Sequence, residues 1–160
     1  KIRAVFNTSP ENLLVAPFLQ SQWKKHLNVE VTLDNQEWKF YLSQLNTDPP
    51  PLFRLGWGAD YPDPDNFMNL FTSRSGNNKT GWANPEFDRL IEQAAQELDL
   101  SIRMDLYNKA QALLCQQDLP IIPLFTSTMN MLVKDYLRGF LPNAMDVTYV
   151  KNLSYRHLRE

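Results

Sequence analysis

The sequence predicts an α/β fold in which a parallel or mixed sheet is flanked by helices. Three short runs with strand composition, residues 2–6, 29–33 and 52–55, are separated by two stretches with helical spacing of apolar residues. Capping residues and prolines mark the ends of those stretches. Because a helix usually connects neighbouring parallel strands, this β-α-β-α-β order favours parallel pairing.

The first helix is expected to begin after Ser9. Ser9 is a suitable N-cap, and Pro10 suits the first helical position because its missing amide hydrogen is not needed there. Pro17 is expected to kink this helix or to make it restart. The apolar residues that give the helix one face are Leu13, Leu14, Phe18, Leu19 and Trp23.

The second helix is expected to follow the strand at 29–33, with Asp34 or Asn35 as its cap. Residues 49–51 are three consecutive prolines, which end the helix before the third strand at 52–55. One side of this helix should carry Trp38, Tyr41, Leu42 and Leu45.

The second half of the chain is expected to be mainly helical. Asn84 and Pro85 can open one helix, and Ser101 can cap another. Strands are expected at 121–125, 129–133 and near 147–150. The inward residues of the two helices are expected to be Phe87, Leu90, Ile91, Ala94, Ala95 and Leu98 in the first, and Leu106, Tyr107, Ala110, Leu113 and Leu114 in the second.

Composition narrows the possible functions. The chain has 160 residues, 43% hydrophobic and 21% charged, which is ordinary for one globular domain with a substantial core. A net charge of −2 gives no basic field, so nucleic acid and anionic membrane are not expected partners. The single cysteine, Cys115, is expected to be a small core residue. The strand-like run directly after Lys1 suggests a piece of a longer protein.

The most informative segment is the acidic, aromatic loop at residues 56–66, which follows the third predicted strand. In open α/β sheets, ligands bind beyond the carboxyl ends of the strands, where this loop should lie. Two prolines limit its flexibility, while Trp57 and Tyr61 offer flat apolar faces. Its carboxylates suit a ligand with a positive charge. The alternative is a rigid connection whose carboxylates are solvated or cap a helix.

Within this loop, Asp60 is the best ligand candidate because it lies closest to the strand. Asp63 and Asp65 are more typical of capping or surface groups. A calcium site built from the three would lack the glycine and glutamate of an EF-hand loop. A carboxylate pair for glycoside hydrolysis would need a raised pKa, which no pattern indicates.

Other reactive residue types give weaker signals. His26 and His157 are far apart and are expected at the surface, and no nucleophile–base motif is present. No catalytic residue, metal or cofactor is therefore expected. Arg54 is either at a sheet edge in water or directed at the ligand end of the sheet. Trp38 and Trp57 are more often core residues than ligand platforms.

Several separated motifs together resemble the periplasmic oligopeptide-binding proteins, the receptors of ABC peptide importers. The matching stretches are WKKHLNVEVTLDNQEWKFYL at 23–42, GWGADYPDPDNFMNLF at 56–71, NPEFDRLI at 84–91, RMDLYNKAQALL at 103–114 and LPIIPLF at 119–125. The resemblance covers essentially the whole chain. It is specific because several separated motifs occur in the same order as in the family. It implies one α/β lobe of a two-lobed binding protein over residues 1–160, with 151–160 as a possible return to a missing N-terminal lobe.

The resemblance also implies roles for single residues. Asp60 matches the aspartate that takes the peptide's N-terminal ammonium, and Trp57 and Gly58 match positions flanking the bound peptide. Arg54 matches a cation that meets the peptide C-terminus in some relatives. The remaining two positions are Trp38, which matches a pocket-lining aromatic, and Asn12, which replaces a histidine near the ligand's C-terminal end.

The function expected from the resemblance is capture of oligopeptides for import, without catalysis. The expected partners are a peptide, the missing lobe and ABC permease subunits in the inner membrane. The location would be periplasmic, or lipid-anchored outside the cytoplasmic membrane. Two alternatives stay open: a related receptor for a metal chelate, haem, murein peptide or sugar, and a hydrolase that uses the acidic loop.

Overall fold

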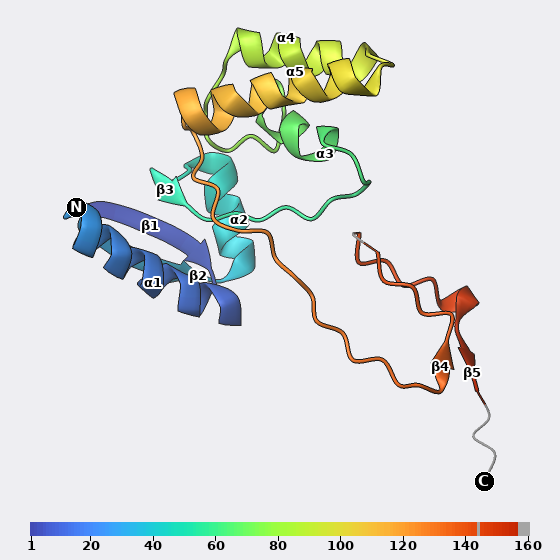
Figure 1. Ribbon diagram of the computed structural model, residues 1–160. Coiled ribbons are helices and arrows are strands. Elements are labelled where there is room, and N and C mark those ends of the chain that lie inside the picture. Colours follow the sequence, from blue (N-terminus) through green and yellow to red (C-terminus); the bar gives the residue numbers. More distant parts are fainter. Residues whose placement is uncertain (144, 157–160) are drawn as a thin grey trace. The chain divides into compact units, whose positions relative to one another are not determined.

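The computed structural model describes residues 1–143 and 145–156, and these form two compact units (Figure 1). The first unit comprises residues 1–57 and 76–81, and the second comprises 58–75 and 82–160. His157, expected at the surface, lies outside the described residues. Each unit has its own elements, and the two are described separately below.

The first unit contains a three-stranded parallel sheet. Its strands are β1 (Ile2–Asn7), β2 (Val31–Gln36) and β3 (Leu52–Phe53), in the order β2-β1-β3, and both outer strands run parallel to β1. This confirms the predicted parallel α/β topology. The third strand is shorter than predicted, although the amide of Arg54 still donates to the Val5 carbonyl at 3.0 Å.

Helix α1 (Pro10–Leu27) begins where the sequence predicts. The Ser9 hydroxyl accepts a hydrogen bond from the Asn12 amide at 3.1 Å, and Asn28 ends the helix in the left-handed conformation. The expected restart at Pro17 is wrong, because one continuous helix contains this residue. A proline removes only one of the many amide donors along an 18-residue helix.

Helix α2 (Trp38–Thr47) is capped by Glu37, which accepts hydrogen bonds from the amides of Lys39 and Phe40. The prediction of Asp34 or Asn35 as the cap was wrong. Both residues belong to β2, where they pair with Val5 and Phe6 of β1, so the strand continues beyond the point at which the helix was expected. One buried core cluster of this unit consists of Val5, Tyr41 and Leu45, with Phe53 packed against it.

The second unit is mainly helical. A short helix α3 (Asp65–Met68) and a 3₁₀ turn η1 (Asn69–Phe71) precede α4 (Pro85–Gln96) and α5 (Leu100–Ala112), and α5 runs into a π-helical turn η2 (Leu113–Gln117). Helices α4 and α5 lie side by side (Figure 1). Their shared core is formed by Phe87, Leu90, Ile91, Ala94, Tyr107, Ala110 and Leu114.

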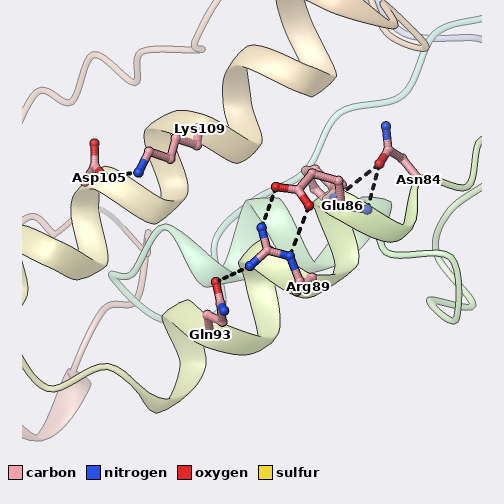
Figure 2. Close-up of polar contacts among 7 residues, drawn as sticks. Asn84, Glu86, Arg89, Gln93, Asp105 and Lys109 are labelled. Carbon is pink, nitrogen blue, oxygen red and sulfur yellow. Dashed lines mark hydrogen bonds and ion pairs between the residues drawn. The ribbon is translucent and has the colours of Figure 1, made fainter.

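Polar groups define the ends and the outer faces of these helices. Asn84 caps α4 as predicted, accepting from the amides of Glu86 and Phe87 (Figure 2). The cap of α5 is Asp99 and not Ser101, because the Asp99 carboxylate accepts from the amides of Ser101 and Ile102. Two further expectations were wrong at the end of α4: Ala95 is exposed, and Leu98 is 94% exposed.

The strands predicted at 121–125, 129–133 and 147–150 are not observed. Instead, β4 (Leu137–Arg138) pairs antiparallel with β5 (Ser154–Tyr155), and a 3₁₀ turn η3 (Val150–Asn152) precedes β5. An isolated extended segment has no ladder of hydrogen bonds to hold it as a strand. Among the described residues, no neighbouring strand pairs with 121–125 or 129–133.

The remaining expectations concern single residues and membrane insertion. Cys115 is partly buried against the core of the second unit, and burial raises the pKa of its thiol, as befits a small core residue. His26 is exposed in the last turn of α1. No helix in the described part of the chain has the length and apolar character that crossing a bilayer requires.

Candidate ligand-binding site

The six predicted site residues are divided between the two units. Gly58 and Asp60 belong to the second unit. The first unit contains the other four, which are Asn12, Trp38, Arg54 and Trp57. Each group is therefore described within its own unit.

The loop at 58–66 is fixed by hydrogen bonds between its own residues. The Asp60 amide donates to the Asn66 side-chain oxygen at 3.2 Å, and Asn66 is buried at the start of α3. The Asp63 amide donates to the Tyr61 carbonyl, and the Tyr61 hydroxyl donates to Asp65 at 2.7 Å. These bonds give the loop a defined shape, to which Pro62 and Pro64 add stiffness.

The three carboxylates of this loop have different surroundings. Asp63 forms a bidentate ion pair with Arg103, with both oxygen–nitrogen distances at 2.7 Å. Hydrogen bonding to Arg103 lowers the pKa of Asp63, and hydrogen bonding to Asp65 raises the pKa of Tyr61. The Asp60 side chain, in contrast, is exposed and makes no hydrogen bond or ion pair with any described residue.

This arrangement does not favour a metal site. Asp63 and Asp65 direct their carboxylates at partners within the unit, and no group of three or more acidic, histidine or cysteine side chains in the described residues is placed to hold a metal ion. A free carboxylate on a firmly held loop is instead suited to binding one positively charged group. Gly58 lies close by in sequence, and a Cβ atom added there would meet nothing within 4 Å.

In the first unit, Arg54 lies directly after β3. The hydroxyl of the fully buried Tyr41 donates to the Arg54 carbonyl at 2.6 Å, and burial raises the pKa of Tyr41 to about 12, so this donor stays protonated. The Arg54 guanidinium lies 3.3 Å from the carboxylate of Glu11. The backbone of Arg54 is thus anchored, while its side chain forms a partly exposed ion pair of the kind that contributes little stability.

Trp38 and Trp57 are more exposed than core tryptophans. Their exposed fractions are 47% and 43%, so the alternative that they are core residues is not supported. Trp38 begins α2, with its ring 6.2 Å from that of the buried Tyr41. Large half-exposed aromatic rings are suitable contacts for an amphipathic ligand.

Asn12 behaves differently from the other predicted residues. It is only 2% exposed, and its amide nitrogen donates to the carbonyl and the side-chain oxygen of Asn7 at 2.9 and 3.0 Å. These bonds join α1 to the end of β1, so Asn12 is a scaffold residue in this structure and its burial does not favour a direct contact with ligand. No sequence motif connects Asn7 and Asn12, so this contact could not be predicted.

The sequence also missed residues that support the candidate site. Arg103 and Asn66 hold the loop at 58–66, and Tyr41 anchors the Arg54 carbonyl, but none of the three was among the predicted site residues. The 40-residue separation of Arg103 and Asp63 explains the omission, because no local pattern connects them. The only available signal was that both occur in stretches that resemble the same family.

In open α/β sheets, ligands bind beyond the carboxyl ends of the parallel strands, and the acidic loop follows the third strand of this helix-flanked sheet in the sequence. Residues 1–79 match the profile described as "Bacterial extracellular solute-binding proteins, family 5 Middle". The oligopeptide-binding protein OppA of Bacillus subtilis is 34% identical over 157 residues, which are 98% of this chain and 29% of that protein.

Solved structures agree with this match. The murein tripeptide-binding protein MppA of Escherichia coli has a TM-score of 0.86 at 35% identity, over 96% of this chain and 30% of that one. Haemophilus influenzae OppA, in complex with RPPGFSPFR, has a TM-score of 0.85 at 33% identity, with the same two shares. The chain belongs to the bacterial extracellular solute-binding proteins of family 5, a family of binding proteins. It spans about a third or less of the length of these relatives.

Proposed function

We propose that this chain is part of an extracytoplasmic receptor that binds oligopeptides for delivery to an ABC importer. In this proposal the Asp60 carboxylate accepts the N-terminal ammonium of the peptide. Relatives named as oligopeptide-binding and periplasmic proteins support both the ligand class and the location. The receptor would bind and release its ligand without catalysing a reaction.

The observation that carries the proposal is the unpaired carboxylate of Asp60 on a loop whose other acids are occupied. Asp63 and Asp65 have partners, whereas Asp60 is exposed and has none among the described residues. An ammonium group can donate charge-assisted hydrogen bonds to such a carboxylate. Because every unmodified peptide has this group, the interaction suits a receptor that accepts many sequences.

The other site residues have supporting roles in this proposal. Trp57 and Trp38 contact apolar side chains of the peptide, and Gly58 allows the peptide backbone to approach and pair with the loop. Arg54 exchanges Glu11 for the peptide's C-terminal carboxylate, which the exposed geometry of their ion pair permits. Asn12 acts indirectly, by fixing Asn7 at the end of β1.

The energetics require a partner lobe. Micromolar binding needs about 8 kcal/mol, and ordering a flexible peptide costs several kcal/mol first. A charge-assisted hydrogen bond supplies only about 1.5–3 kcal/mol. We therefore propose that residues 1–160 contribute one lobe, that a second lobe of the same protein closes over the peptide, and that the closed form docks on permease subunits.

The test is calorimetric titration of the complete receptor with a tripeptide and with its N-acetylated form. Asp60→Asn should weaken binding of the free tripeptide by about 10- to 150-fold, the equivalent of about 1.5–3 kcal/mol, and should change the affinity for the acetylated form little. Asp105→Asn is the matched control, because Asp105 lies on the exposed surface of α5, where it pairs with Lys109 (Figure 2). Equal effects of Asp60→Asn on both peptides would refute the role of Asp60.

A murein peptide is the second candidate ligand, since MppA is among the similar structures. Murein peptides share the amine with ordinary peptides but differ along the chain. Mass spectrometry of the ligand released from the purified receptor distinguishes the two. A ligand without an amine would contradict the proposal for Asp60 in either case.

A further inference from the structure

Arg103 on α5 is held by an unusually complete set of contacts within the second unit. Besides its two bonds to Asp63, its guanidinium donates to the Ala94 carbonyl at 3.1 Å and to the Tyr107 hydroxyl at 2.9 Å. Its central carbon lies 5.0 Å from the centre of the Tyr107 ring, and its side chain is 19% exposed. The guanidinium therefore has one defined position against the helical core.

A short series of hydrogen bonds connects Arg103 to the backbone of Asp60. Both Asp63 oxygens accept from Arg103, and Oδ1 also accepts from the Asp65 amide, at 2.9 Å. Asp65 is the first residue of α3 and Asn66 the second, and the Asn66 side chain accepts from the Asp60 amide. Each step is a fixed contact on a partly buried group, so movement of Asp63 would displace the loop that carries Asp60.

The ion pair is better explained by geometry than by stability. A charged pair removed from water gains little net free energy, whereas a bidentate arginine–carboxylate pair fixes distance and angle. It joins residues 40 apart in sequence, so it attaches the loop to the helical core. Among the described residues the Asp60 side chain has no such attachment, so the direction of its carboxylate depends on its backbone.

We infer that Arg103 is a positioning residue, which holds the Asp60 loop in the shape that favours a ligand with a free amino terminus. The inference rests on the proposed function. Asp60 supplies the charge, and Arg103 sets where that charge lies. Loss of the Arg103–Asp63 pair should reduce discrimination between free and acetylated amino termini, even though neither residue touches the peptide.

The readout is the ratio of the two affinities, measured by calorimetry for a free tripeptide and its N-acetylated form on the complete receptor. Arg103→Met should lower this ratio about tenfold, equivalent to about 1.4 kcal/mol. Arg103→Lys should lower it by a smaller factor, because lysine keeps the charge but cannot form the bidentate pair of a guanidinium. Asp63→Asn, which removes the other charge of the pair, should lower the ratio as Arg103→Met does. In an Asp60→Asn background, Arg103→Met should leave the ratio unchanged.

The matched control is Arg89→Met on the neighbouring helix. Arg89 pairs with Glu86 and Gln93 at the exposed surface of α4, so its removal deletes an arginine without touching the loop (Figure 2). The ratio should stay as in the unaltered receptor. A loss of affinity for both peptides by the same factor in Arg103→Met and Asp63→Asn would show a merely structural role and overturn the inference.

Hydrogen exchange separates this inference from the proposed function. Amides of Asp60 and Asp65 donate within the loop, so their exchange should speed up in Arg103→Met and Asp63→Asn, while the α4 and α5 amides should change less. Unchanged loop exchange in both variants would overturn the positioning role. A receptor that never discriminates between the two peptides would instead overturn the role of Asp60.

Discussion

Asp60 and Asp63 lie three residues apart in one loop, yet the structure gives them opposite surroundings. Asp63 is clamped by Arg103 and also accepts a backbone hydrogen bond, whereas Asp60 is exposed and has no side-chain partner among the described residues. The residue type is the same, so the partners decide the role. Residues 63–66 form the inner part of the loop, which is attached to the helical core. Residues 58–60 form the outer part, which is available to contact a ligand.

The largest expected effect comes from the core on which the inner part depends. Phe87→Ala should lower the local free energy of unfolding by about 3–5 kcal/mol, since a fully buried ring is removed and a cavity remains. Hydrogen exchange of the α4 and α5 amides in the complete receptor measures this. An effect below about 1 kcal/mol would show that Phe87 is not a core residue.

Breaking the Arg103–Asp63 ion pair should have the next largest effect on stability. Asp63→Asn should lower the local free energy of unfolding of the loop at 58–66 by about 2 kcal/mol, because the Arg103 guanidinium loses its charged acceptor. Hydrogen exchange of the Asp60 and Asp65 amides measures the change, with Asp105→Asn as a surface control. Equal effects of the two variants would remove the distinction between a supporting acid and an ordinary surface acid.

The Arg103–Asp63 ion pair also predicts that the stability of the protein depends on pH. The pKa of Asp63 is lowered in the folded protein, so the stability it contributes is complete above the ordinary aspartate value and is lost as the pH falls through the lower folded pKa. The stability difference between the unaltered protein and Asp63→Asn should therefore be constant at neutral pH and shrink below about pH 4. Urea unfolding across that range tests the sign.

A similar test applies in the first unit. Tyr41→Phe removes the hydrogen bond to the Arg54 carbonyl and should cost about 1 kcal/mol of stability. Binding of a peptide that lacks a C-terminal carboxylate should change less than binding of its free-acid form, if Arg54 meets that carboxylate. Tyr149→Phe, on an exposed tyrosine, is the control.

The smallest expected change in stability belongs to Asp60. Asp60→Asn should alter the free energy of unfolding by less than about 0.5 kcal/mol, as is usual for exposed groups without partners. Thermal unfolding of the unliganded receptor measures it. Substantial destabilisation would show that the Asp60 carboxylate supports the fold, and the contrast with Asp63 would be lost.

Local patterns predicted much of the fold. The strand at 2–6, the caps at Ser9 and Asn84 and the parallel order of three strands were all predictable, because each depends on neighbouring residues or on the alternation of elements. The predictions at 121–125 and 129–133 failed since a strand requires a partner, which composition does not supply. Ser101 was mistaken for a cap because two cap-forming residues lie close together.

The candidate site was predictable in part for the same reason. The position of Asp60 after the third predicted strand identified it as a ligand candidate, and Asp60 is exposed in the structure. Sequence could not show that Asn12 is buried against Asn7, or that Arg103 reaches Asp63, because both depend on tertiary contacts. Peptide binding by the six residues stays a prediction.

The empty space around Gly58 has an evolutionary consequence. Since an added Cβ atom there would meet nothing within 4 Å, mutation can introduce side chains at this position without repacking the scaffold. Single changes at this position could therefore alter which side chains a receptor accommodates, while the Asp60 carboxylate, which we propose to accept the peptide's amino terminus, stays in place.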